Sequence, residues 1–371
     1  MPIHITEEGK IVYYAYPNGD RVPDFSYCGY QRSEHPIPYI EAKVYVHPPQ
    51  GDATAVIQRA IDYVSSLPLQ DNQFRGAIQL LPGIYHIEGQ LLIRKSGIVL
   101  RGSGCNASGG TVLQAKGFTK NELIRILGYD NAKTSDSLKV SDKYVPVNAT
   151  FIPLASADKH LKVGDKIRVI RPCTPEWLAE LGTGNQQEYN FSKWQPGQYT
   201  MAWERNVTQV SKEGIEIDVP ITMSLDPEYG GGYVTPLKWT GRIYNIGIEE
   251  AKLRVKTPEG ISIGALRQEA APETVLFEIL HPLGFNAAQD GWVRRVTAKH
   301  FAGSAVMLLE GSSQITVEDC KFLEPVSEIA NHRRYAFHTL GQQTLFQRCY
   351  SENGYRDFSV GKGVPGPNAF V

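Results

Sequence analysis

The sequence has few cysteines and lacks the close pairs of them that build metal sites. The five are Cys28, Cys105, Cys173, Cys320 and Cys349, an odd number without a C-x-x-C spacing. This pattern argues against a zinc site and against a disulfide framework. The chain also lacks a run of about 18 apolar residues, so we expect no transmembrane helix. No signal peptide is visible, because Met1-Pro2-Ile3 leads directly into polar sequence.

An excess of charge of one sign is missing as well. Lys and Arg number 38 and Asp and Glu number 39, which leaves a formal net charge of −1 at pH 7. A nucleic-acid groove requires a clustered basic excess, so we expect no nucleic-acid partner. An anionic sugar is not excluded, because a few Arg and Lys side chains in one cleft are enough to bind it. The 19 Tyr and five Trp suit carbohydrate binding, with core packing as the alternative role.

The first recognisable pattern is a helical segment followed by short strands. Residues 1–50 are rich in Tyr and Pro and predict an irregular N-terminal arm. Apolar side chains then recur at helical spacing, which predicts one amphipathic helix over 54–64, with Asp52 or Thr54 available to cap it. From about residue 77, strands of three to five residues alternate with glycine-containing turns. This rhythm is typical of a solenoid built from coils.

Residues 145–240 interrupt this rhythm. Two apolar strands flank the Gly164-Asp165 turn, and residues 214–219 alternate between apolar and polar side chains. We therefore predict a small inserted antiparallel β domain. Its four tryptophans form either a sugar-stacking wall or the small core of the insert; they are Trp177, Trp194, Trp203 and Trp239.

An apolar-x-x-small pattern occurs four times in the second part of the chain. Its members are Ile248-Glu-Glu-Ala251, Val293-Arg-Arg-Val296, Val317-Glu-Asp-Cys320 and Phe346-Gln-Arg-Cys349. The steps of 24 and 29 residues between the last three each fit one coil, and the first step of 45 residues indicates two coils or one coil with a large loop. We expect the four small residues to stack in one inward ladder, where a free cysteine behaves as a small apolar side chain.

Three motifs follow one another between residues 51 and 113. They are Gly51-Asp52-Ala-Thr54-Ala-Val-Ile57-Gln58, Leu81-Pro82-Gly83-Ile84-Tyr85 and Leu100-Arg101-Gly102-Ser103-Gly104. Their order resembles the opening of the pectate-lyase-like proteins (pectate lyase superfamily, PL-3 type). The resemblance implies an all-β fold, a right-handed parallel β-helix solenoid with an N-terminal cap helix. The expected division is an arm at 1–50, cap helix and first coils at 51–144, the inserted antiparallel β domain at 145–240, and later coils at 241–371 that are truncated at the C-terminus.

The same opening is found on polysaccharide lyases, glycoside hydrolases, epimerases and phage tailspikes, so it is specific for fold and weak for chemistry. It implies a secreted, periplasmic or cell-surface protein of bacterial type that degrades a polysaccharide. We favour a lyase that cleaves a uronic-acid-containing glycan by β-elimination. The alternatives are a glycoside hydrolase on the same scaffold and a non-catalytic, tailspike-like carbohydrate-binding solenoid. We expect a polysaccharide substrate, no membrane partner, and a monomer rather than an oligomer.

A uronic-acid lyase must neutralise the carboxylate, abstract the C5 proton and protonate the leaving oxygen, and Arg, Lys, His and Tyr side chains can do this. The densest basic cluster spans residues 331–338. In it we predict Arg333, Arg334 and His338 as catalytic. The predicted substrate-binding residues are Arg295, Lys299, His300, Tyr335 and Trp203. An ordinary solvated face of charged residues is the alternative.

Further expectations concern metals and carboxylates. No cofactor or metal ligand is predicted, and no specific motif supports Ca²⁺, although the chemistry would allow it. A hydrolase would need two carboxylates at a set separation, and nothing in the spacing of the acidic residues selects a pair. The Asn-Thr-Asp, Asp-Asp and Gly-His-Gly set of polygalacturonases and the Arg-x-Pro-x-x-Arg of classical pectate lyases are absent, which argues against those two subfamilies.

Overall fold

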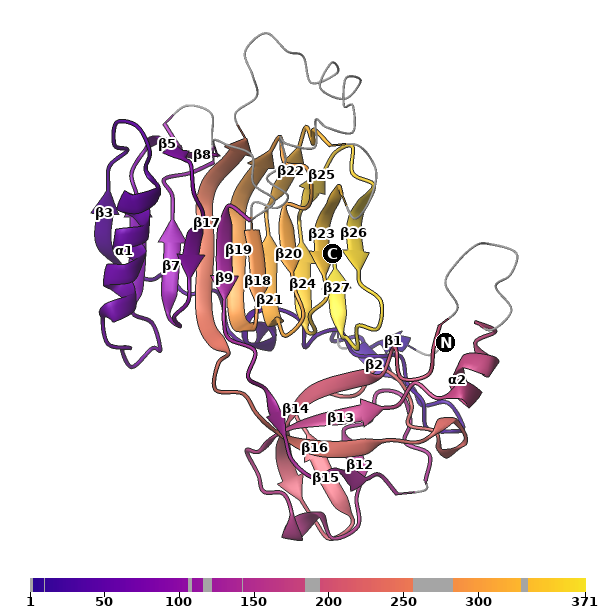
Figure 1. Ribbon diagram of the computed structural model, residues 1–371. Helices are drawn as coiled ribbons and strands as arrows, with labels where there is room; N and C mark the ends of the chain where they lie inside the picture. Colours follow the sequence, from indigo (N-terminus) through magenta and orange to yellow (C-terminus); the bar gives the residue numbers. More distant parts are fainter. Residues whose placement is uncertain are drawn as a thin grey trace. The chain divides into compact units, whose positions relative to one another are not determined.

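In the computed structural model, much of the chain winds in successive coils, and strands at three positions of the coil stack on the equivalent strands of the next coil (Figure 1). The structure describes residues 3–9, 11–105, 109–115, 122–141, 143–183, 194–255, 283–327 and 333–371. They fall into two compact units. The solenoid unit comprises Cys28–Asp130, Gly241–Gly361 and Asn368–Val371, and the antiparallel unit comprises Met1–Tyr27, Asn131–Thr240 and Lys362–Pro367.

Parallel strands from successive coils form three faces of the solenoid unit. Face 1 contains β3 (Ala42–Val46), β4 (Gly76–Leu80), β7 (Ile98–Arg101), the first parts of β17 (Ile243–Val255) and β19 (Ala288–Lys299), β21 (Ser313–Glu318), β24 (Thr344–Gln347) and β27 (Asn368–Phe370). Face 2 contains β5 (Gly83–Ile87), β8 (Thr111–Ala115), the last parts of β17 and β19, β22 (Lys321–Leu323) and β25 (Tyr350–Ser351). Face 3 contains β6 (Leu91–Ile93), β9 (Ile124–Leu127), β18 (Leu283–Asn286), β20 (Val306–Leu308), β23 (Tyr335–Thr339) and β26 (Arg356–Val360).

The strand register confirms the predicted ladder. Ile248 pairs with Val293, Val293 with Val317, and Val317 with Phe346. Ala251 pairs with Val296, and both are buried in the same core as Cys320. The 45-residue step is therefore a single coil that includes residues 256–282, which lie outside the described residues. All five cysteines are free, and Cys320 fills the interior as a small apolar side chain.

Helix α1 (Thr54–Ser66) confirms the predicted amphipathic helix and packs against β3, β4, β6 and β7. Asp52 Oδ1 accepts hydrogen bonds from the Thr54 amide at 3.0 Å and from the Thr54 hydroxyl at 2.6 Å, which satisfies a free donor at the helix start. The same oxygen accepts the Glu88 amide after β5. This carboxylate therefore ties the helix start to the first coil.

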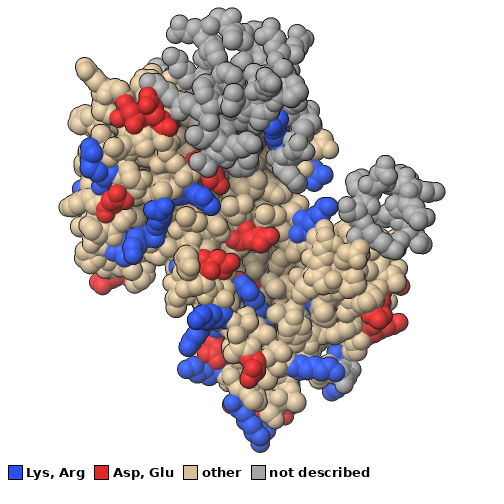
Figure 2. Space-filling view, viewed as in Figure 1, with Lys and Arg blue, Asp and Glu red and all other residues tan. Residues whose placement is uncertain are grey.

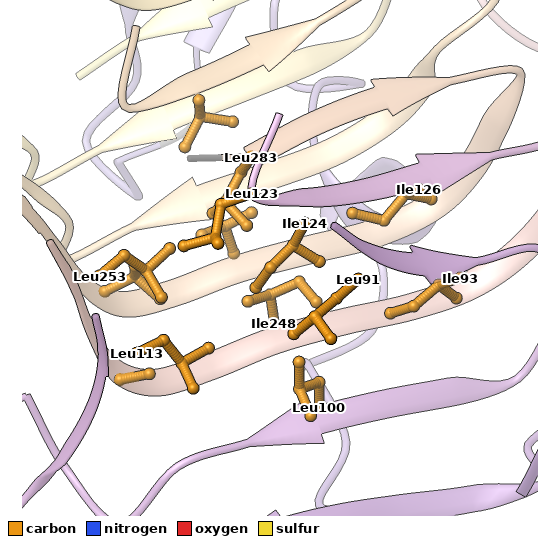
Figure 3. Packing of buried hydrophobic residues seen from close by; sticks show 14 of the residues in the cluster. Leu91, Ile93, Leu100, Leu113, Leu123, Ile124, Ile126, Ile248, Leu253 and Leu283 are labelled. Carbon is orange, nitrogen blue, oxygen red and sulfur yellow. The ribbon is translucent and has the colours of Figure 1, made fainter. Parts of the chain in front are cut away.

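The interior of the coils is a continuous apolar core (Figure 3). In the close-up, Leu91, Leu100, Leu113, Ile248 and Leu253 point toward one another from strands of different faces. Each buried Leu or Ile stabilises the fold by about 1.5–3 kcal/mol relative to an exposed one. Stacking such residues at the same position of every coil holds the coils in register.

Part of face 1 is covered by the segment that precedes β3. Tyr30 packs edge-on against Trp292 with ring centroids 5.2 Å apart, and its amide donates to Thr316 Oγ1 at 2.8 Å. Ile40, Phe74, Ala77 and Val99 belong to the same small buried cluster, which is separate from the main core of the solenoid unit. Tyr39 lies over the Arg101 guanidinium at 4.3 Å. These contacts occupy outward positions of face 1 that a ligand would otherwise reach.

The antiparallel unit contains short strands with its own core. They are β1 (Ile3–Ile5), β2 (Ile11–Tyr13), β10 (Lys133–Thr134), β11 (Leu138–Lys139), β12 (Phe151–Pro153), β13 (Lys166–Arg171), β14 (Met201–Val210), β15 (Gly214–Ile217) and β16 (Tyr233–Lys238), with α2 at Pro175–Glu180. All their pairings are antiparallel, including β13 with both β14 and β16. None of the helices in the described ranges is long and apolar enough to cross a membrane.

Candidate functional site

Face 2 presents a set of basic side chains at equivalent positions of neighbouring coils. Lys252 pairs with Thr297, which pairs with Lys321, and Arg254 pairs with Lys299 two residues further along the same strands. On β17 the alternating residues Leu253 and Val255 are buried in the core, whereas Lys252 and Arg254 are partly exposed. Because strand side chains alternate between the two sides of a sheet, these cations point outward together.

A carboxylate joins two of the predicted substrate-binding residues at one edge of this face. Glu324 Oε1 lies 2.7 Å from Lys299 Nζ, and Glu324 Oε2 lies 2.8 Å from His300 Nε2. The hydrogen bond from Lys299 and the neighbouring His300 hold the pKa of Glu324 below its ordinary value. The amide of Glu324 donates to Glu352 Oε1 of the following coil at 2.9 Å. Lys299 and His300 are thus fixed in place by one ionised side chain.

Lys252 has the most unusual environment of the described cations on this face. Partial burial lowers its pKa, and the positive charges of Lys299 and Arg254 lower it further. Glu324 acts in the opposite direction. A lysine whose neutral form is favoured in this way can accept a proton nearer to neutral pH than an isolated lysine can.

Arg254 is oriented by a chain of side chains across earlier coils. Its Nε donates to Gln114 Oε1 at 2.8 Å, and the Gln114 amide nitrogen lies 3.4 Å from His86 Nδ1. Arg254, Gln114 and His86 occupy the same register position of three successive coils. One guanidinium edge is therefore fixed against the glutamine.

The arrangement provides a local surplus of positive charge in a chain whose overall charge is close to zero. Lys252, Arg254, Lys299 and Lys321 share one face, against the Glu324 carboxylate. On the side of the molecule seen in Figure 2, by contrast, basic and acidic side chains are mostly interspersed. A row of outward cations on stacked strands suits an extended chain with regularly spaced anionic groups.

Arg295, the remaining predicted binding residue on these strands, belongs to a different arrangement. The two middle residues of each apolar-x-x-small unit alternate in sign from coil to coil, as Glu249-Glu250, Arg294-Arg295, Glu318-Asp319 and Gln347-Arg348. Arg295 forms an ion pair with Glu250, and Arg348 lies 2.8 Å from Asp319. These charges neutralise one another between coils.

The predicted catalytic residues lie at or just before β23 on face 3. Arg334 is buried, and its guanidinium donates to the main-chain oxygens of Ser327 and, at 3.4 Å, Asn353. This side chain holds two loops together, which does not fit the predicted catalytic role. Arg333 is partly exposed, while Asn331 and His332 of the same cluster lie outside the described residues.

His338 and Tyr335 lie together on β23. His338 Nδ1 is 2.7 Å from Ser359 Oγ on β26, and its ring meets the Tyr335 ring edge-on at 5.4 Å. The Arg356 guanidinium lies 5.0 Å from the centre of the Tyr335 ring. Both residues are more than nine-tenths buried, so they contribute to packing between the last coils.

The prediction that Trp203 stacks on a sugar is wrong. Its side chain is fully buried in the core of the antiparallel unit, and its indole Nε1 donates to Thr222 Oγ1 at 3.0 Å and to the Pro365 carbonyl at 2.9 Å. Trp177 and Trp194 pack in a second small cluster of that unit. Trp203 therefore has the alternative role that the sequence allowed, as a core residue of the insert.

Lys252 and Arg254 were not singled out from the sequence, which also gave no reason to select Glu324 among the acidic residues. Lys252 and Arg254 stand four and six residues after Ile248, the first position of the repeat pattern. At the same offset of six from Val293 stands Lys299. Aligning the repeats and reading past their fourth position would have revealed the basic column. In the ranges that the structure describes, no three His, Cys, Asp or Glu side chains gather in a metal-binding group.

Comparison with known proteins leaves the family open. No family model matches the chain. A tRNA(Ile)-lysidine synthase of Bacteroides thetaiotaomicron is 47% identical over 74 residues, which is 19% of this chain and 17% of that protein. The chain therefore spans less than a fifth of the length of this curated relative.

The solved structures that are similar to the chain at low identity include a phage tailspike and a bacterial protein. The tailspike of Pseudomonas phage phi297 has a TM-score of 0.45 and 12% identity, covering 81% of this chain and 42% of the tailspike. A putative glycosyl hydrolase of Parabacteroides merdae has a TM-score of 0.36 and 11% identity, covering 86% of this chain and 89% of that one. The chain spans less than half of the tailspike, and both likenesses are distant.

Proposed function

We propose that the protein binds an acidic polysaccharide along face 2 and cleaves it by β-elimination next to a uronic acid. The observation that carries the proposal is the convergence of Lys252, Arg254 and Lys299 on one outward surface, with the pKa of Lys252 lowered. Carboxylates recur along a polymer of uronic acids, and cations at equivalent positions of neighbouring coils are about 5 Å apart. Charge of opposite sign therefore meets at several points.

Each basic residue has a role in this proposal. Arg254 and Lys299 bind the carboxylate of the sugar, which makes the proton on the adjacent C5 more acidic. Neutral Lys252 takes that proton, the electron pair forms the C4–C5 double bond, and the C4–O bond breaks. The departing oxygen receives a proton from the Lys252 ammonium or from water. The Glu324 carboxylate keeps Lys299 and His300 in position.

The finer features of the proposal come from the sequence motifs. We place the chain with the pectate-lyase-like proteins, and we propose that its coils are right-handed, as parallel crossover connections are in about 98% of cases. A secreted or cell-surface location follows from a polymeric extracellular substrate. A glycoside hydrolase and a non-catalytic binding solenoid are the alternatives.

The test is a screen of acidic and neutral polysaccharides with product analysis. The lyase proposal expects an ultraviolet-absorbing unsaturated uronide from at least one uronate polymer. Lys252→Met should abolish its formation, and Lys95→Met, which removes an exposed cation outside face 2, should leave it unchanged. New reducing ends without ultraviolet absorbance would indicate a hydrolase. Binding without any released sugar, together with a trimer in solution, would indicate a tailspike-like fibre.

A further inference from the structure

A hollow lies between the edge strand β3 and helix α1, apart from face 2. Its volume is about 340 Å³, and the residues that line it include Tyr45, His47, Val56, Arg59 and Tyr63. This volume lies at the lower end of the roughly 300–1,000 Å³ typical of ligand pockets. None of the lining residues belongs to a strand of face 2.

Helix α1 carries a second stripe of side chains besides the one that enters the core. Ile57, Ile61 and Val64 are fully buried among the coils. Val56, Arg59 and Tyr63 follow at spacings of three and four residues, which places them on one neighbouring side of the helix. All three line the hollow, so the helix turns this stripe toward β3.

Two aromatic rings of the hollow remain largely exposed to solvent. Tyr45 is 64% exposed and Tyr63 is 54% exposed, although both line a concave surface. Tyr45 lies on the edge strand of face 1, where it pairs with Gln79 of β4, and Gln79 pairs in turn with Arg101 of β7. Rings with one apolar face open and a hydroxyl at the tip suit the apolar face and polar rim of a sugar.

The guanidinium of Arg59 is available for a ligand. Within the described part of the chain, no hydrogen bond or ion pair engages it, and the side chain is exposed beside Tyr63. Other arginines of the solenoid unit do have partners, such as Arg294 with Glu249 and Arg348 with Asp319. A planar guanidinium can form two parallel hydrogen bonds with a carboxylate.

We propose that this hollow is a second saccharide-binding subsite that holds one uronate residue. The sugar ring packs on Tyr45 and Tyr63, and its carboxylate pairs with Arg59. The choice of a uronate rests on the proposed function, whereas the hollow and its lining residues do not depend on it. Such a subsite would hold a second part of the polymer while face 2 acts on the first.

Binding of short oligouronides to the full chain tests the proposal. The measurement is isothermal titration calorimetry in a Lys252→Met background, which prevents turnover. We expect two sites per chain. Arg59→Gln should weaken one of them by roughly tenfold or more, because it removes a charge-assisted pair. Arg59→Lys should recover part of the affinity, because it restores the charge without the planar fork.

The controls separate this subsite from the activity on face 2. Arg94→Gln removes an exposed cation outside the hollow and should leave both sites unchanged. Tyr63→Ala should weaken the same site as Arg59→Gln, and the thermal unfolding midpoint shows whether that variant is folded. A neutral oligosaccharide that binds as tightly as the uronide overturns the choice of ligand.

The outcomes also distinguish failure of this inference from failure of the proposed function. If Arg59→Gln and Tyr63→Ala leave both affinities unchanged while the Lys252-intact chain releases unsaturated product, the subsite is refuted and the lyase proposal stands. If no substrate is cleaved but Arg59→Gln still removes one binding site, the subsite stands and the lyase proposal fails.

Discussion

Glu249 Oε1 accepts a hydrogen bond from Arg101 Nε at 2.5 Å, across the boundary between two stacked coils. Its other oxygen accepts Arg294 Nε of the next coil at 2.5 Å and the Trp292 indole at 3.0 Å. The Glu249 side chain is almost completely buried. One carboxylate therefore links the coils that precede and follow the inserted antiparallel unit in the sequence, which is where the register of the solenoid must be re-established.

Removing this charge should strongly destabilise the solenoid unit. Glu249→Gln leaves Arg101 and Arg294 without their shared carboxylate, and breaking a buried ion pair in this way costs about 3–5 kcal/mol. The free energy of unfolding, measured in urea, gives the size of the effect. Glu34→Gln is the matched control, because the exposed Arg32–Glu34 pair at 3.2 Å should contribute about 0–1 kcal/mol. Equal effects of the two substitutions would contradict the prediction.

The same carboxylate should make stability depend on pH at the acidic end. Burial alone would raise the pKa of Glu249, but the hydrogen bonds from Arg101, Arg294 and Trp292 outweigh it and lower the pKa. A carboxylate with a lowered folded-state pKa stabilises the protein above its unfolded pKa of about 4.3, and this contribution is lost as the pH falls toward the folded value. The slope of unfolding free energy against pH below about 4.3 should decrease in Glu249→Gln.

The charged middle residues of the apolar-x-x-small units, which alternate in sign from coil to coil, should help to hold the later coils in register. Arg295→Glu places a carboxylate between Glu250 and Asp319 and should destabilise the unit. Adding Glu250→Arg should recover about 0.2–1 kcal/mol, the range for partly exposed pairs, because it restores one attractive contact. A double-mutant cycle by urea unfolding measures this coupling. Strictly additive effects of the two substitutions would show that the rows do not interact.

Much of the solenoid could be predicted from the sequence because each coil repeats the same apolar position. The spacing from Val293 to Val317 to Phe346 directly gives the pairing that the strands adopt. The role of Arg295 could not be predicted in this way. The pattern aligns Arg295 with Glu250, but the 45-residue step left open whether another coil lies between them, and only the folded chain shows that their strands are adjacent. Local sequence shows a charge, but the neighbouring coil decides whether that charge is already neutralised.

Burial limited the prediction of the site in a similar manner. Trp203 and Arg334 are residue types that bind sugars and carboxylates, and each has a charged residue directly beside it in the sequence, Glu204 and Arg333. The structure places both in fully or nearly buried positions with main-chain partners. Lys252 was overlooked for the opposite reason: it is a single lysine in an ordinary strand. Its pKa is lowered first by burial and then by Arg254 on the same strand and by Lys299, which only the stacking of the next coil brings close.

Arg334 should prove to be a stabilising residue whose loss leaves catalysis intact. Arg334→Lys cannot span the Ser327 and Asn353 oxygens as the guanidinium does, so we expect a loss of about 1–3 kcal/mol in unfolding free energy. At a temperature where the variant is folded, the rate of product release should equal that of the unaltered chain. A large loss of rate with unchanged stability would restore the catalytic role predicted from the sequence.

The pH profile of cleavage should report the charges around Lys252. The base must be neutral, so activity should rise with pH through the pKa of Lys252, which burial and then Lys299 and Arg254 hold below its ordinary value. Lys299→Met removes a like charge and should move this rise to higher pH. Glu324→Gln removes an opposite charge and should move it to lower pH. Shifts of roughly half a unit to one unit are expected for partly solvated neighbours.

Lys321→Met is the control for these shifts. It removes a cation from the same face that is not among the charges acting on Lys252, and it should leave the pH profile unchanged. Shifts of the same sign in Lys299→Met and Glu324→Gln would exclude Lys252 as the base.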